Sequence, residues 1–304
     1  NLRGKLLIEP KAIPDLTVGL SFTHDDREFG ETIALFTIDD ANDNRQIPSN
    51  RPYRDDTVYD LGVAKIDYDI DDQFSFSSIT TSSELDRNRG GDTDRTAEDL
   101  EFFDSTITTD SFTQEFLLNY SGDRLEGVLG GYISQIDSEQ FFESTFTFDV
   151  VSQANLGPTV AGLVTLQLVE AGFPLAAAQA QGQQTAAAVV PLYAGGFLIN
   201  AVQQNPVEVE TPAIFADFTY DLTDSVRLFG GFRYDTEEQT ITTGNEVSIL
   251  TPLPDPAAFP PIAAVITQVN GLLVANALDA TEEPRTLQSP SFEAFLPKFG
   301  IGWD

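Results

Sequence analysis

Apolar and polar residues alternate with a two-residue period on both sides of a short break in the segment Ala213-Ile214-Phe215-Ala216-Asp217-Phe218-Thr219-Tyr220-Asp221-Leu222-Thr223-Asp224-Ser225-Val226-Arg227-Leu228-Phe229-Gly230-Gly231-Phe232-Arg233-Tyr234. In its first half, Ile214 and Phe218 lie in one row, and Asp217 and Thr219 lie in the other. Such alternation is typical of a strand with one apolar face, and the break contains the Asp and Thr residues that favour tight turns. The segment therefore predicts an antiparallel hairpin of strands Pro212–Asp221 and Ser225–Asp235.

Other segments share this period, and the sequence predicts about nine strands in all. The further segments are Leu2–Glu9, Asp15–Thr23, Thr57–Asp69, Phe74–Ser83, Ser111–Tyr120, Arg124–Gln135 and Phe292–Trp303. Two of them are ambiguous, because Phe74–Ser83 is largely polar in both rows and Thr57–Asp69 can be phased either way.

The connections between these strands alternate between short and long. The short links are Pro10–Pro14, Ile70–Gln73, Ser121–Asp123 and Leu222–Asp224, and the long ones are approximately 24–56, 84–110, 136–211 and 236–291. Long loops are uncommon in compact domains, whereas outer-membrane barrels combine short periplasmic turns with long extracellular loops. We therefore predict an all-β fold in which residues 1–304 form a partial antiparallel transmembrane β-barrel domain.

The two rows of each strand predict which surface each side chain faces. Apolar rows are expected to face lipid and polar rows the lumen. The lumen-side candidates are Glu115, Asp217, Arg227, Arg233 and Lys298. They are either ligand contacts or an internal ladder of ion pairs, and the second reading is favoured. The aromatic residues near short turns, expected to form an interfacial girdle, are Tyr68, Tyr120, Tyr220 and Trp303. A soluble β-sandwich with one buried face would also alternate.

Two of the long loops have helical apolar spacing. In residues 155–205 the spaced residues are Val160, Leu163, Val164 and Leu168, and in residues 256–279 they are Ile262, Val265, Ile266, Val269 and Leu273. Short helices at the barrel mouth are expected, with low-complexity disorder as the alternative for Gln179–Ala188.

Composition excludes several classes of protein. With 16 Lys and Arg against 48 Asp and Glu, the formal charge of the 304-residue chain is -32, which argues against nucleic-acid binding. The chain has no Cys, so it contains neither a disulfide nor a thiolate site. No continuous apolar run reaches the ~20 residues of a membrane helix, since Ala186–Ile199 is interrupted by Pro191 and Gly195-Gly196.

Catalytic and metal motifs are weak in this sequence, and we predict no enzyme activity. Nucleophilic catalysis of the Ser–His type needs a histidine base beside the nucleophile, and His24 is the only histidine in the sequence. Acidic doublets such as Asp71-Asp72 are expected on solvated loop surface, and adjacent acids within a strand would point to opposite faces, so neither arrangement gives a catalytic pair. The segment Asp40–Asn44 begins like a calcium loop, but Arg45 replaces the required Gly and Arg51 the final Glu. No cofactor is expected beyond weak Ca2+ contact with acidic loops.

Several strand and turn motifs resemble TonB-dependent outer-membrane receptors. Four motifs carry the resemblance. They are the hairpin Arg3-Gly4-Lys5-Leu6-Leu7-Ile8-Glu9-Pro10 with Asp15-Leu16-Thr17-Val18, the pair Phe112-Thr113-Gln114-Glu115-Phe116 and Gly130-Gly131-Tyr132, the segment Ala213–Tyr234, and the segment Pro297-Lys298-Phe299-Gly300-Ile301. These motifs cover the strands and leave out the long loops.

The resemblance implies active uptake of a scarce nutrient, such as siderophore-bound iron, cobalamin or a glycan, across the outer membrane of a Gram-negative bacterium. Family members have a 22-stranded barrel closed by a plug that binds TonB. The chain has no Met and shows neither the plug, nor the TonB box, nor the C-terminal strands of the family. We therefore expect a piece of a longer protein that binds TonB only when full length. The alternatives are a passive porin-type or other outer-membrane barrel, and a soluble acidic β-rich binding or adhesion module.

Overall fold

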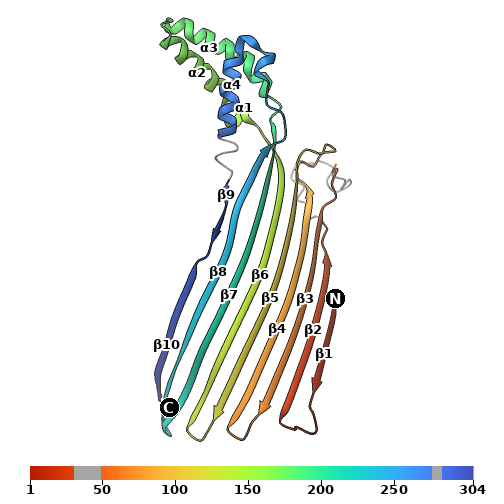
Figure 1. Cartoon of the computed structure of the whole chain (residues 1–304), viewed down its shortest axis with the longest axis vertical. Coiled ribbons are helices and arrows are strands. Elements are labelled where there is room, and N and C mark those ends of the chain that lie inside the picture. The colour runs from red at the N-terminus through yellow and green to blue at the C-terminus, as the bar shows by residue number, and fades with distance from the viewer. Residues whose placement is uncertain (31–48, 276–282, 304) are drawn as a thin grey trace.

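The computed structural model describes residues 1–30, 49–275 and 283–303, which form an antiparallel sheet of ten strands with a helical lobe at one end (Figure 1). The strands are β1 (Leu2–Ile8), β2 (Leu16–Glu28), β3 (Arg54–Asp69), β4 (Phe74–Asp92), β5 (Phe102–Ser121), β6 (Leu125–Phe148), β7 (Phe197–Thr223), β8 (Val226–Ile249), β9 (Glu283–Gln288) and β10 (Ser291–Trp303). The expected antiparallel all-β architecture is confirmed.

The sheet is a simple meander. Strands β1 to β8 pair in chain order, β10 pairs with the half of β8 nearest the turns, and β9 pairs with its far half. In the described sheet, β1 forms one open edge, and β9 and β10 together form the other. The short turns therefore lie at one end, and the longer connections lie at the other (Figure 1).

Local chemistry explains the tight turns. In the turn between β3 and β4, the Asp71 carboxylate accepts hydrogen bonds from the amides of Gln73 and Phe74, both at 2.8 Å. An Asp side chain in this position replaces backbone partners that a turn leaves unsatisfied. The turn therefore starts β4 at a defined residue.

The strands run further from the turns than the sequence predicts. The loop predicted at 84–110 is reduced to residues 93–101, and the loop at 136–211 is reduced to residues 149–196. Strand β9 lies within the connection predicted at 236–291, so the structure has ten strands rather than nine. The missed part of β4, Glu84–Asp92, is largely polar in both rows, and the missed part of β6 has Phe141 and Phe142 on opposite faces. Neither part has the alternation of apolar and polar residues by which a strand is predicted, and backbone pairing with the neighbouring strands extends them.

The helical lobe lies beyond the far ends of β6, β7 and β8 (Figure 1). Its helices are α1 (Val150–Gln153), α2 (Leu156–Glu170), α3 (Leu175–Val189), η1 (Val190–Tyr193), η2 (Pro256–Ala258), η3 (Pro260–Ile262) and α4 (Ala263–Leu273). The helices expected in both loops are confirmed, and α3 covers the segment for which disorder was the alternative. Gly182 permits close packing of α2 and α3, because a Cβ there would lie 2.5 Å from the Ala161 carbonyl oxygen.

Buried apolar side chains are concentrated in this lobe and its junction with the sheet. The core cluster consists of Val150, Leu156, Val160, Val164, Ala186, Val189, Tyr193, Phe197, Val269 and Leu273. No helix in the described ranges is long and apolar enough to cross a membrane. The calcium-like segment 40–44 lies outside the described residues.

Candidate functional site

The strand register separates the sheet into two faces. Residues paired directly across strands share a face, and successive residues alternate. Leu20, Phe116, Leu129, Phe218 and Phe232 belong to what we name the apolar face, and Asp217, Arg233 and Lys298 lie on the opposite, polar face. The two faces therefore place apolar and ionic side chains on opposite sides of the sheet.

The apolar face has a defined band next to the short turns. On β5 the band extends from Phe112 to Tyr120, a span of nine residues. Its large side chains are substantially exposed, with Phe116 49% and Phe218 48% accessible. The length agrees with the ~9–11 residues of a transmembrane β-strand.

All four girdle candidates lie on the apolar face at the turn end of this band. Tyr68 is on β3, Tyr120 on β5, Tyr220 on β7 and Trp303 on β10. The ring of Tyr120 packs against Phe74, with 4.8 Å between centroids. Trp303 is 85% exposed.

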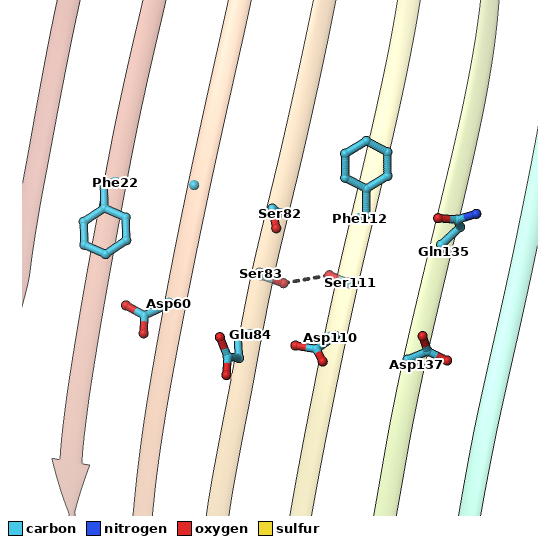
Figure 2. Close-up of a pocket in the computed structure, with 11 residues that line it drawn as sticks. Phe22, Asp60, Ser82, Ser83, Glu84, Asp110, Ser111, Phe112, Gln135 and Asp137 are labelled. Atoms are coloured by element: carbon cyan, nitrogen blue, oxygen red, sulfur yellow. Dashed lines mark hydrogen bonds between the residues drawn. The ribbon is translucent and has the colours of Figure 1, made fainter.

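A row of carboxylates marks the other edge of the band. Asp60, Glu84, Asp110 and Asp137 are paired in register on β3 to β6 (Figure 2). The row continues to His24 on β2, whose Nδ1 lies 2.8 Å from the Asp60 carboxylate. Like charges directly across a sheet repel one another, and water screens that repulsion far better than hydrocarbon. The row therefore belongs in an aqueous environment.

The few polar side chains inside the band satisfy one another. Thr80 Oγ1 donates to Gln114 Oε1 at 2.6 Å, and Gln114 Nε2 donates to Ser78 Oγ at 3.0 Å. These residues account for the ambiguous pattern of Phe74–Ser83. Mutual hydrogen bonds reduce the cost of placing polar groups in an apolar setting.

The polar face pairs most of the predicted lumen residues with acids. Lys298 on β10 forms an ion pair with Asp217 on β7, across Gly231 of the intervening β8. A Cβ at Gly231 would lie 3.0 Å from Asp217 Oδ2, so the missing side chain leaves room for this contact. The pair therefore connects three strands.

The remaining candidates follow the same pattern. Arg233 bonds Asp235 at 2.7 Å, and Arg227 Nε lies 3.9 Å from Asp221 Oδ1. Glu115 lies in the row that leads through Tyr132 and Ala213 to Asp235. These contacts agree with an ion-pair ladder, and they form no catalytic arrangement.

The comparisons with known proteins agree with this geometry. Residues 8–304 match the family model described as TonB dependent receptor-like, beta-barrel. The chain belongs to that family. Its members are outer-membrane transport proteins rather than enzymes.

A solved structure supports the fold. The chain is similar to FyuA, the ferric yersiniabactin uptake receptor from Yersinia pestis, with a TM-score of 0.57, 12% identity and 99% of this chain covered. The match covers 34% of FyuA, so the chain spans about a third of the length of that receptor. No curated protein matches the sequence.

Within this TonB-dependent receptor fold, no metal-binding group of three or more acidic, His or Cys side chains occurs among the described residues. His24 faces the carboxylate row on the apolar face, and no nucleophile pairs with it among the contacts of the described chain.

An arginine cluster that the sequence pattern did not predict lies at the far end of β2 to β5. We name it the arginine rim, and it consists of Arg27, Arg51, Arg54, Arg87, Arg89 and Arg95. Six of the chain's 16 basic residues gather there, inside segments that sequence analysis assigned to solvated loops. The clustering of arginines between residues 27 and 95 was the available signal.

Carboxylates hold parts of this rim in place. Arg87 makes a bidentate contact with Asp55 through Nε and Nη2, at 2.9 and 2.8 Å. Arg51 binds Asp99 at 2.9 Å, and this hydrogen bond keeps the pKa of the Asp99 carboxyl below its ordinary value. The arginines are therefore positioned by neighbouring acids.

Proposed function

We propose that this chain forms part of the wall of an outer-membrane uptake receptor, with its apolar face in lipid and its polar face toward the lumen. The observation that carries the proposal is the exposed band of large apolar side chains on a sheet whose buried core lies elsewhere. A soluble protein rarely exposes a contiguous apolar patch of this kind.

The edges of the band support this placement. Aromatic residues at one edge suit a membrane interface, and the carboxylate row at the other suits water beyond the hydrocarbon. On this basis the short turns are periplasmic, and the helical lobe and the arginine rim are extracellular. Residues 1–304 then form one partial β-barrel domain with long outer loops.

The transport role follows from the family. We infer active uptake of a scarce nutrient of the siderophore-iron, cobalamin or glycan type, across the outer membrane of a Gram-negative bacterium. Energy coupling through TonB is inferred for the full-length receptor. The ion-paired polar face suits a wall in contact with water. The residues that we assign to this hydrated surface are Glu115, Asp217, Arg227, Arg233 and Lys298.

Site-directed spin labelling tests the placement directly. Because the chain contains no Cys, a single substitution at Ile214, Phe218 or Leu228 provides a unique labelling site in vesicles. We expect high accessibility to oxygen and low accessibility to a water-soluble nickel complex at these positions. Thr219→Cys, on the opposite face, is the matched control and should show the reverse. Labels on the apolar face that are shielded in a water-soluble particle would reject the proposal.

Trp303 offers an independent measurement, since it is the only Trp in the chain. Its fluorescence should be quenched more strongly by lipids brominated near the headgroup than by lipids brominated near the chain ends. Equal quenching by both, or none, would contradict an interfacial position.

A further inference from the structure

Three residues of the arginine rim, Arg87, Arg89 and Arg95, line a cavity of about 520 Å3 on the polar face of the sheet. It is lined by Phe29, Gly30, Tyr53, Asp55, Arg87, Arg89, Asp92, Thr93, Arg95 and Phe103. The volume lies within the ~300–1,000 Å3 of small-molecule sites.

The charge of this cavity is opposite to that of the chain. Arg87, Arg89 and Arg95 outnumber Asp55 and Asp92 in its lining, whereas the whole chain carries a formal charge of -32. Salt screens charges over roughly 8 Å at physiological ionic strength, so these near residues dominate the local potential. The lining therefore carries a small excess of positive charge within an acidic chain.

Two of the arginines that line the cavity make no side-chain hydrogen bond to another described residue, unlike Arg87. Arg89 Nε is buried and has no hydrogen-bond partner among the described residues, and it lies 3.4 Å from Asp55 Oδ2 at ion-pair distance only. The backbone of Arg95 is held in the left-handed region (φ 56°), where its amide donates to Asp92 Oδ1 at 2.9 Å. Both side chains border the cavity.

An aromatic wall completes the cavity. The rings of Tyr53 and Phe103 lie 6.4 Å apart on either side of Gly91. A Cβ at Gly91 would lie 3.0 Å from the Tyr53 ring and 3.6 Å from Phe103, so glycine permits this approach. The Arg89 guanidinium lies 6.0 Å from the centre of the Phe103 ring. Planar apolar surface and cationic groups are thus adjacent.

We propose that this cavity binds a small organic anion, whose carboxylate or other oxyanion meets Arg89 and Arg95 while a planar apolar part packs on Tyr53 and Phe103. Guanidinium groups recognise oxyanions through directed, charge-assisted hydrogen bonds. The inference names a substrate class for the proposed receptor and rests on that function for its biological meaning, but the binding itself does not require transport.

Fluorescence titration of the full chain in detergent with 2-naphthoate tests the site. The cation 2-naphthylmethylammonium has the same ring system with the opposite charge, and it should bind at least about tenfold more weakly. Arg89→Gln and Arg95→Gln should each weaken 2-naphthoate binding about tenfold, through loss of a charge-assisted contact. Arg124→Gln, in a short turn at the other end of the sheet, removes the same charge and should leave affinity unchanged.

A charge change of the opposite sign separates electrostatics from structural damage. Asp92→Asn keeps an acceptor for the Arg95 amide but removes a negative charge from the lining, so 2-naphthoate should bind severalfold more tightly. Circular dichroism of the strands confirms folding of each variant. Weakened binding in Asp92→Asn, or equal loss in Arg124→Gln, would overturn the proposal.

The remaining source of an oxyanion is a lipid headgroup. If the two rim variants changed binding to vesicles containing phosphatidylglycerol and left 2-naphthoate affinity unchanged, the rim would be a lipid contact and the proposal would fail. Failure of the spin-label test would reject the membrane placement, but it would leave a positive titration intact. The two proposals can therefore fail separately.

Discussion

The helical lobe and the strand band use similar apolar residues in opposite ways. Ile266 in the lobe is 0% exposed, and Val150 and Val160 are also fully buried there. In the band, Phe116 and Leu129 are each 49% exposed. The lobe therefore has the organisation of a water-soluble unit, in which apolar contacts are made within the protein.

The comparison shows that this chain buries large apolar side chains in its helical lobe and exposes them in its strand band. The carboxylate row lies between these regions and separates exposed apolar residues from the polar upper strands. Beside the turns, strands such as β5 have a mainly apolar row on one face, whereas the far part of β4 is largely polar in both rows. Mutations that affect one region and spare the other test this division.

The largest effect is expected in the lobe core. Ile266→Ala should destabilise the lobe by about 2–5 kcal/mol, because it removes buried contacts and leaves a cavity. Leu166→Ala is the control, since Leu166 in α2 is 66% exposed. The measurement is the thermal loss of helical circular dichroism, and equal effects of the two substitutions would contradict a buried core.

A charge in the band should have a slightly smaller effect, confined to the lipid-bound protein. Phe116 is at the middle of the nine-residue band, and Phe116→Arg should destabilise the vesicle-inserted sheet by about 2–4 kcal/mol. Leu117→Arg places the same charge one residue away on the polar face, where the cost should be small. Denaturant unfolding from phospholipid vesicles measures both, and similar losses would remove the distinction between the faces.

The sequence predicted the halves of the strands beside the short turns, because apolar and polar residues alternate there. It failed in segments such as Glu84–Asp92, since a strand in water on both faces needs no apolar row. Strand β9 was missed for a related reason: Glu283-Pro284-Arg285 has no apolar alternation, and its pairing is supplied by β8.

Pairs between distant residues were also beyond sequence reasoning. Asp217 and Lys298 were both identified as lumen-side candidates, but only the register of β7, β8 and β10 brings them together. The arginine rim joins three separate segments in the same way. Composition indicated the charges, and the strand register determined their neighbours.

A smaller change in the lobe concerns one hydroxyl group. Tyr193 donates to Asn270 Oδ1 at 2.7 Å, and burial raises the pKa of Tyr193 from 10.0 to about 12. Tyr193→Phe should cost about 1 kcal/mol at neutral pH. Because folding stabilises the protonated phenol, this advantage is complete below about pH 10 and is lost as the pH rises through about 12. The free energy of lobe unfolding should be measured for the wild type and Tyr193→Phe at neutral pH and above about pH 12. The difference between the two proteins should shrink at the higher pH, and a constant difference would exclude the linkage.

The smallest effect is expected in the connection between β4 and β5. The Thr96 hydroxyl and the amides of Glu101, Thr96 and Leu100 hydrogen-bond the Asp94 carboxylate and keep its pKa below 3.8. A lowered pKa means that the stabilisation is present above pH 3.8 and is lost as the pH falls through the folded-state value. The connection should therefore open in acid while the strands remain paired.

Pepsin digestion near Leu100 measures this opening. Asp94→Asn should be cleaved faster than the wild type at about pH 5, and the two should converge as the pH falls through the lowered folded-state pKa of Asp94. Comparing both proteins at each pH removes the pH dependence of the protease. Asp72→Asn, in a short turn at the opposite end of the sheet, should leave cleavage near Leu100 unchanged. If Asp94→Asn were cleaved at the same rate as the wild type at every pH, the Asp94 carboxylate would not stabilise this connection. The conformation of the arginine rim would then depend on the strands alone.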